Sequence, residues 1–527
     1  MKIKILSTAL LLGGIGLFSC KKALDKQPFT QIADAAAYSS PTKVLQSLNG
    51  VYDAAQSGFY AGGAVRGYPF GAANIEQGDM GGEDMLNQAT FYQITYEATY
   101  TNTSANQDYM FETLYSLINK ANLTIDGIKG AADKGIITSA QASQYEAECR
   151  FLRAMAHHEL VLHFSRPFAD DNGGKMGIIY RDFSVNSESA IDEAAGLKRA
   201  TVKVADDYTK ILADLDFAET NLNAAPDVAT YRASKAAAIA LKMRVKMHMG
   251  DWAGVITEGA KIVSGTTNFS SPINGYKLTT AADGPFTSNT SSESIFSIKS
   301  AATDNAGVNG GLAQMFGDPA LGGRGLVRVS PIMWSDPDWK CDDARRTLLY
   351  RTAGTTTNAV YTTKYKDYAN LSDGVPQIRY AEVLLMLAEA QARTATGVSS
   401  VAVDLLNAVR NRAVTNVAEQ FTVAGFATQN DLIKAILKER RIEFLAEGKR
   451  WGDISRLALD ANFAPVAGGG IPAKVGSGAA TASMFNCAGA TITKSLPAIP
   501  YSDNRFIWPI PLVEIQQNPN YDQNPGY

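Results

Sequence analysis

Apolar residues recur at three- and four-residue intervals along most of the stretch from Pro376 to Leu459. Its first part carries one apolar stripe made of Ile378, Ala381, Leu384, Leu385 and Ala388. Such spacing is typical of an amphipathic helix with one buried face. Thr428 and Asp431 have the spacing of a capping box, in which a hydroxyl and a carboxylate each satisfy a free backbone amide. The stretch therefore predicts two consecutive helical hairpins, at about 376–412 and 428–459.

The same helical period predicts two earlier pairs, at about 107–164 and 202–264. Each pair is roughly the size of a tetratricopeptide unit, about 34 residues. The spacing between pairs is irregular, which indicates a degenerate array of four pairs rather than a regular solenoid.

Two segments lack this period. Residues 58–106 are rich in Gly, Asn, Gln, Thr and Tyr, and residues 265–375 are rich in Gly, Ser, Thr and Asn with short β-prone runs. Loop-rich segments of this length inside a compact domain are usually functional. We therefore predict a mainly α fold over residues 40–527, in which a tetratricopeptide-like scaffold carries a loop-rich second lobe containing short strands.

The N-terminus has the features of an export signal. Met1–Lys4 is basic, and the apolar run over residues 5–18 is too short to span a bilayer. Cys20 follows directly, in a context that resembles a lipobox. We predict a lipoprotein signal peptide over residues 1–19, a lipidated Cys20 and a tether over 20–39; several acyl chains would make such an anchor stable. The alternative is an ordinary secretory signal with a chance cysteine.

The charge balance of the chain argues against a nucleic-acid partner. The chain has 527 residues and a formal net charge of −3, with no basic stripe of the kind that binds nucleic acid.

Cys149, Cys341 and Cys487 remain once Cys20 is lipidated, and their wide spacing is not that of a disulfide framework. We expect Cys149 to be buried as a small apolar side chain, while one bonded pair among the three stays open.

Enzyme motifs are weak. His158 and His163 flank a spacing one residue longer than the zinc-protease HExxH, which on a helix turns the imidazoles roughly 140° apart. No nucleophile elbow, P-loop or dinucleotide-binding fingerprint occurs.

Four acidic residues lie among turn residues and are interpreted as solvated or capping groups: Asp336, Asp338, Asp342 and Asp343. A glycosidase pair drawn from distant segments remains an alternative. We predict no metal and no cofactor.

A dense charge run follows at Glu439–Glu443 and Lys449–Arg450. We interpret it as a ladder of helical ion pairs at three- and four-residue spacing. The functional alternative is a site for an anion or a protein partner.

A carbohydrate surface needs flat aromatic faces with polar groups at their rims. Both loop-rich segments supply this mixture. The candidate ligand residues are Tyr68, Phe70, Asp79, Tyr96, Tyr100, Asn102, Trp334, Trp339 and Tyr365. For any single ring the alternative is core packing between the lobes.

Several blocks of the chain resemble one family. RYAEVLLMLAEA, LNAVRNRA and ERRIEFLAEGKRWGDISRL are similar to the C-terminal signature of the SusD/RagB family, and SLNGVYDA, EAECRFLRAMAHHELVLHF and NPNYDQNPGY also resemble family blocks, in family order. Members are outer-membrane lipoproteins of Bacteroidetes that bind nutrients beside a TonB-dependent transporter. The resemblance implies a helical scaffold on which long excursions carry the ligand surface.

The resemblance thus implies a non-catalytic protein, lipid-anchored in the outer membrane and exposed at the cell surface. It would bind an oligomeric nutrient, in the first place an oligosaccharide or polysaccharide, and deliver it to a SusC-like transporter. The alternatives are a peptide ligand of the RagB type, a lipid-anchored glycan hydrolase, and an assembly protein that binds the transporter but no nutrient. The sequence does not identify the ligand.

Overall fold

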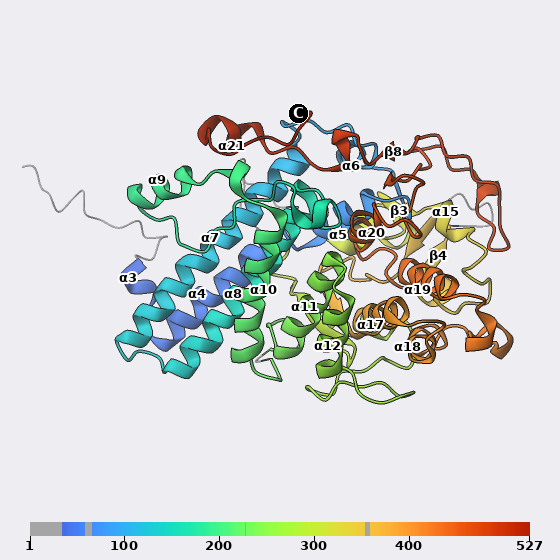
Figure 1. Cartoon of the computed structure of the whole chain (residues 1–527), viewed down its shortest axis with the longest axis horizontal. Coiled ribbons are helices and arrows are strands. Elements are labelled where there is room, and N and C mark those ends of the chain that lie inside the picture. Colours follow the sequence, from blue (N-terminus) through green and yellow to red (C-terminus); the bar gives the residue numbers. More distant parts are fainter. Residues whose placement is uncertain (1–33, 58–65, 227, 354–358) are drawn as a thin grey trace, which may run out of the picture.

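The computed structural model of the chain describes residues 34–57, 66–226, 228–353 and 359–527. Helices dominate it, and the strands are short (Figure 1). The prediction of a mainly α fold is confirmed. Cys20, the signal peptide over 1–19 and loop residues 58–65 lie outside the described residues. No helix in the described part of the chain is long and apolar enough to cross a membrane.

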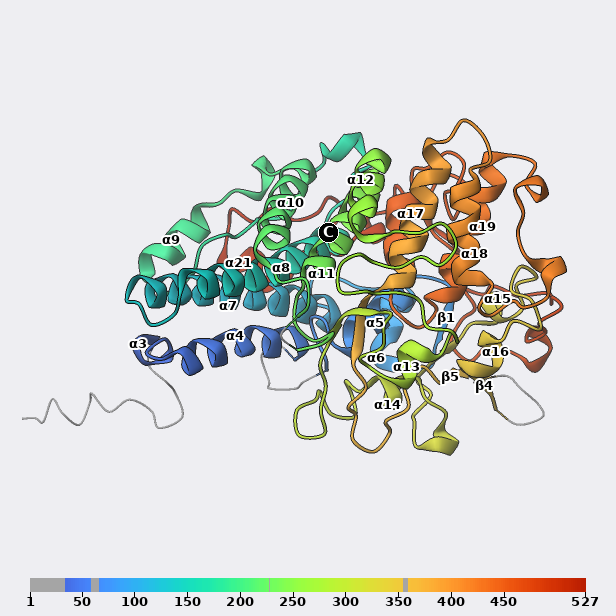
Figure 2. The same cartoon turned by 90° about the horizontal axis from the view of Figure 1, so that it is seen from below.

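The longer helices form a continuous stack in which each packs on the next. They are α4 (Pro41–Gln56), α7 (Ala105–Asp133), α8 (Ser139–Phe164), α10 (Val204–Asn221), α11 (Lys235–Met249), α12 (Trp252–Ile262), α17 (Tyr380–Thr394), α18 (Ser400–Arg410) and α19 (Gln429–Glu443). Figure 2 shows the stack running from α4 and α7 at one end to α17–α19 at the other. The predicted pairs at 107–164, 202–264 and 376–412 fall on consecutive members of this stack, whereas the predicted pair at 428–459 contributes only α19 to it.

Local signals set several helix ends. A capping box of Thr138 and Gln141 opens α8, and the predicted box of Thr428 and Asp431 opens α19. Gly250 adopts φ 71°, a left-handed conformation that glycine takes without steric cost, and it ends α11. Asp251 then caps α12. The stretch at about 232–264 therefore forms two helices, with the break at Gly250 that the sequence predicts.

Short elements surround the stack. The helices are α3 (Asp34–Ala37), α5 (Ala72–Met80), α6 (Thr90–Tyr96), α9 (Glu188–Gly196), α13 (Gly284–Thr287), α14 (Leu312–Phe316), α15 (Pro331–Trp334), α16 (Arg345–Leu348), α20 (Arg450–Leu457) and α21 (Leu512–Gln517). The strands form two-stranded antiparallel sheets: β1 (Met85–Asn87) with β3 (Val327–Val329), β2 (Ser294–Ile298) with β6 (Val375–Arg379), β4 (Tyr350–Thr352) with β5 (Val360–Thr362), and β7 (Gly470–Ile471) with β8 (Ile499–Pro500).

Strand β6 corrects the predicted start of the third helical pair. Residues 376–379 form most of this strand, and α17 begins only at Tyr380. The strand is buried along its whole length and pairs with β2 from the loop-rich segment 265–375, which we call the insert. A short apolar run does not distinguish a buried strand from a helix, so the pairing partner decides.

The described residues contain one disulfide. Cys341 bonds Cys487, with an S–S distance of 2.17 Å, and joins the insert to the segment after α20. Cys149 is a free, buried thiol, as expected for a small apolar side chain.

The charge run of α19 forms buried, long-range ion pairs. Arg345 places one guanidinium nitrogen 2.6 Å from Glu439 and 2.9 Å from Glu443. Glu443 also binds Arg379 at 3.1 Å and Arg412 at 2.5 Å. We call Arg345, Arg379, Arg412, Glu439 and Glu443 the α19 network. It corrects the predicted ladder of ion pairs within the helix, because the partners come from the insert, from β6 and from the residues after α18.

Trp334 and Trp339 belong to the core. Their rings pack edge to face 5.4 Å apart, and Trp339 contacts Tyr350 in the same way. The Arg346 guanidinium lies 4.6 Å from the Trp334 centroid and 4.2 Å from that of Trp339. Trp339 is fully buried and Trp334 nearly so. This corrects the expectation that the two rings face a ligand, since protein atoms already cover them.

Truncation of Trp339 should therefore destabilise the fold. We expect Trp339→Ala to lower the free energy of unfolding by about 3–5 kcal/mol, because it leaves a cavity in a packed aromatic cluster. Denaturant unfolding measures the loss. The half-buried Trp252 on α12 provides a matched control, and Trp252→Ala should cost clearly less. Wild-type stability in Trp339→Ala would contradict the core position.

Glu382 of α17 links two scaffold helices. Its carboxylate accepts two hydrogen bonds from Arg244 of α11, at 2.8 and 2.7 Å. Burial alone would raise the pKa of Glu382, but Arg244 and Lys449 lower it to about 2, below the ordinary 4.5. The stabilisation from this carboxylate is thus present above pH 4.5 and is lost as the pH falls toward 2.

We expect Glu382→Gln to lower the free energy of unfolding by about 3 kcal/mol at pH 7. The difference from wild type should shrink as the pH falls below 4.5. Chemical denaturation at pH 7, 4.5 and 3 checks this, with the exposed Asp404→Asn on α18 as control. A difference that stays constant across these pH values would refute the proposed role of Glu382.

Candidate functional site

The structure buries almost every residue that the sequence assigned to ligand binding. Only Asn102 is partly exposed. The buried ones are Tyr68, Phe70, Asp79, Tyr96, Tyr100, Trp334, Trp339 and Tyr365. Several also bond to the backbone: Tyr96 donates to the Val475 carbonyl at 2.6 Å, and Tyr365 to that of Ala446 at 3.0 Å. These side chains hold the lobes together and do not form an exposed platform, which corrects the residue-level prediction.

The two loop-rich segments nevertheless meet. Strand β1 of the first pairs with β3 of the second, and the Gln88 amide donates to the Leu326 carbonyl at 2.8 Å. The backbones also approach closely at Gly310, where an added Cβ would lie 2.8 Å from the carbonyl carbon of Arg66. The side chains around this contact are brought together from sequence positions more than two hundred residues apart.

At this contact, part of the surface combines one ring with several hydrogen-bond donors. The Arg66 guanidinium lies 3.9 Å from the centroid of the half-buried Phe91 ring. The exposed Arg324 donates to the side-chain oxygen of the exposed Asn309 at 2.8 Å. We call Arg66, Phe91, Asn309 and Arg324 the junction surface. An apolar ring beside guanidinium and amide groups is the mixture that a saccharide requires.

A buried carboxyl lies near this surface. Glu76 of α5 is fully buried and is hydrogen-bonded to the Tyr92 hydroxyl. Burial raises the pKa of Glu76 well above its usual range, and the Tyr92 hydrogen bond offsets only part of that effect. In the described part of the chain, the Oε1 atom of Glu76 is buried without a hydrogen-bond partner.

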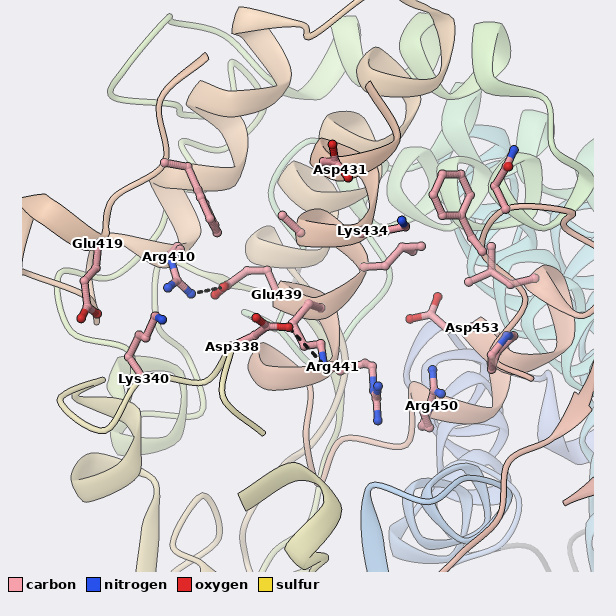
Figure 3. Close-up of a pocket in the computed structure, with 18 of the residues that line it drawn as sticks. Asp338, Lys340, Arg410, Glu419, Asp431, Lys434, Glu439, Arg441, Arg450 and Asp453 are labelled. Carbon is pink, nitrogen blue, oxygen red and sulfur yellow. Dashed lines mark hydrogen bonds and ion pairs between the residues drawn. The ribbon is translucent and has the colours of Figure 1, made fainter. Parts of the chain in front are cut away.

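A second candidate site lies over the exposed side of α19 (Figure 3). It is an open cleft of about 800 Å³. Residues 418–421 and 462–465 form two of its walls, and Asp338 and Lys340 reach it from the insert. We call it the α19 cleft. Its lining mixes Phe421 and Phe463 with lysines, arginines and carboxylates.

Most carboxylates of the α19 cleft are already engaged. Glu439 accepts from Arg410 at 3.1 Å, a pair visible in Figure 3, and also from Arg345. Asp453 lies 3.1 Å from Arg440 and 2.8 Å from Arg456.

The remaining lining carboxylates differ in their contacts. Asp431 caps α19, and Asp338 lies 3.6 Å from Lys438. Glu419 is the exception: its Oε2 is buried and has no hydrogen-bond partner in the described part of the chain.

The histidine motif lies in the protein interior. His158 and His163 of α8 are both buried, and His163 Nε2 is 3.1 Å from Glu159 of the same helix. Burial lowers the pKa of His158 to about 4, so this ring is neutral at physiological pH. Within the described residues, no group of three or more His, Cys, Asp or Glu side chains is arranged to hold a metal ion.

The residue-level prediction did not include the exposed and half-buried residues of either candidate site. The prediction looked for aromatic rings. Most of these residues are instead charged or amide side chains, which do not stand out by residue type from their neighbours along the chain. The missed residues are Arg66, Phe91, Asn309, Arg324, Lys340, Phe421, Lys434 and Phe463. The regional prediction, that both loop-rich segments contribute, was the usable signal.

Two family models match separate parts of the chain. The model described as the SusD family covers residues 335–527, and the model described as "Starch-binding associating with outer membrane" covers residues 22–247. Among curated relatives, SusD-like protein P2 of Formosa agariphila is 27% identical over 392 residues, which are 66% of this chain and 70% of the relative.

Solved structures share the whole architecture. A SusD superfamily protein from Bacteroides fragilis superposes with a TM-score of 0.74 at 26% identity, covering 92% of this chain and all of the other. A laminarin-binding SusD-like protein superposes with a TM-score of 0.64 at 20% identity, over 93% of this chain and all of the other. Sequence models, relatives and fold agree, and the chain belongs to the SusD-like family.

Proposed function

We propose that this chain binds an oligomeric glycan at the cell surface and is anchored in the outer membrane through lipid on Cys20. The matching model described as starch-binding and outer-membrane-associated supports this role, as does the laminarin-binding relative. The bound glycan would pass to a SusC-like TonB-dependent transporter beside which the protein sits. The chain would be a binding protein without catalytic activity.

One observation carries the proposal: the two loop-rich segments converge on the junction surface. Scaffold helices contribute none of its side chains, so the stack serves as a support. Phe91 offers an apolar ring, while Asn309 and Arg324 offer donors and an acceptor to sugar hydroxyls. A platform of this kind tolerates different sugars, and loop shape selects the linkage.

The alternatives make different demands. A glycan hydrolase would need two carboxylates about 5–10 Å apart in a cleft, and turnover of candidate glycans by the purified protein would establish it. A RagB-type role would appear as peptide binding at the same surface. A pure assembly protein would bind the transporter but neither glycan nor peptide.

The junction surface can be tested without disturbing the core. We expect Arg324→Ala to weaken binding of the preferred glycan about tenfold or more, because it removes charged donors from the sugar contact. Since Arg324 is exposed, the melting temperature should stay unchanged. A glycan array identifies the ligand, and calorimetric titration measures affinity. The exposed Arg505 provides a matched control. Unchanged affinity in Arg324→Ala would exclude the junction surface as the binding site.

The anchor makes a separate prediction. Cys20→Ala removes the thiol that would carry lipid, so the protein should move from the membrane fraction to the soluble fraction. Fractionation of cells followed by immunoblotting measures the distribution, and Cys149→Ala is the control because that thiol is buried in α8. Retention of Cys20→Ala in the membrane fraction would contradict a lipid anchor at this position.

A further inference from the structure

Two lysine side chains that line the α19 cleft are unpaired in the described part of the chain. Lys340 and Lys434 line the cleft, and in the described part of the chain neither ammonium has an ion-pair or hydrogen-bond partner. Lys434 is exposed on α19 and Lys340 is half-buried on the insert. Figure 3 shows them set apart across the cleft. We propose that the α19 cleft is a second ligand site, which takes an oligosaccharide bearing carboxylate or sulfate groups.

Most other charged groups near the cleft are already paired with one another, and this decides which ligand charge the cleft favours. Arg441 and Arg450 both bind Glu83, at 2.9 and 2.7 Å. Lys438 is paired with Asp336 and Asp338. The carboxylates Glu439 and Asp453 face buried guanidinium groups. The lining as a whole has six basic side chains against five acidic ones, and in the described part of the chain Lys340 and Lys434 are basic groups of the lining without an ion-pair partner. This small excess of positive charge favours an anionic ligand.

The cleft also has the size and surface for a saccharide. Its 800 Å³ lies within the range of ligand pockets, about 300–1,000 Å³. Phe421 and Phe463 give it apolar rings, each half-buried. The Arg410 guanidinium lies 4.7 Å from the Phe421 centroid, and its Nε has no hydrogen-bond partner among the described residues. Arg410 is 2% exposed, so this unpaired donor belongs to a built wall rather than to a mobile surface chain.

This site is distinct from the junction surface. The α19 cleft is formed by the end of the stack, the insert residues around Lys340 and the segment after α20. It requires neither Phe91 nor Arg324. The two sites can therefore be tested independently of each other. A protein with both sites would bind an acidic polymer at two points.

The experiment uses the full mature chain and three hexasaccharides as probes: an oligogalacturonide, which carries carboxylates, a sulfated carrageenan oligosaccharide, and neutral laminarihexaose. Calorimetric titration compares wild type with the double variant Lys340→Gln/Lys434→Gln. We expect one acidic probe to bind wild type and to bind the variant about tenfold or more weakly. Raising the salt should weaken the wild-type binding, because the ammonium groups face solvent.

Two controls separate the site from general charge and from the junction surface. Lys134→Gln/Lys198→Gln removes two exposed lysines elsewhere and should leave affinity for the acidic probe unchanged. Arg324→Ala is titrated in parallel with the same probes, and any loss that it causes is assigned to the junction surface. Which acidic probe binds distinguishes carboxylate from sulfate recognition.

Three results would overturn the α19 cleft as an acidic-saccharide site: absence of binding by both acidic probes, equal losses in the test and control lysine pairs, or a loss only in Arg324→Ala. Laminarihexaose binding that depends on Arg324 would support the junction surface. It would not bear on the α19 cleft, which is tested by the acidic probes and the lysine variant.

Discussion

The rest of the structure depends on the buried ion pairs of α19. Glu443 binds Arg345 of α16, Arg379 of β6 and Arg412 beyond α18. Each of these groups would be costly to bury alone, and the geometry is favourable only when all partners are present. Arginine suits this position because its planar fork serves two carboxylates at once. The insert and the end of the helical stack are thereby locked into one arrangement.

The same helices also hold the first loop-rich segment. Arg441 of α19 and Arg450 of α20 bind Glu83, which lies between α5 and β1. Nearby, the buried Lys474 donates to the carbonyls of Met80 and Tyr96, at 2.7 and 2.9 Å. Burial lowers the pKa of Lys474 to about 7. Both loop-rich segments are thus tied to α19 and α20, which explains how two stretches with little regular structure keep a defined junction.

The sequence predicted what is local. Helical period, together with one capping box at the start of α19, located α7, α8, α17 and α19 to within a few residues, because these signals lie within one turn of the residues they affect. It did not predict the partners of Glu439 and Glu443, because Arg345 is about a hundred residues away and nothing at that distance marks a pair. The i to i+4 interpretation was the only one available locally, and it was wrong. The burial of Trp339 and Tyr365 was equally unpredictable, since an aromatic ring in a loop fits a core or a ligand surface equally well.

These limits also bear on what family membership implies. The residues that carry the resemblance, above all the run from Glu439 to Leu457, are largely buried and pair with other scaffold residues. In this chain they hold the scaffold together, so they contain little information about the ligand. Arg66, Phe91, Lys340 and Lys434 are in the opposite situation, because they lie at or near the surface and little of the fold depends on them. Under the proposed function, residues of this second kind would decide ligand choice, and a change at them would alter what is bound without altering the family to which the chain belongs.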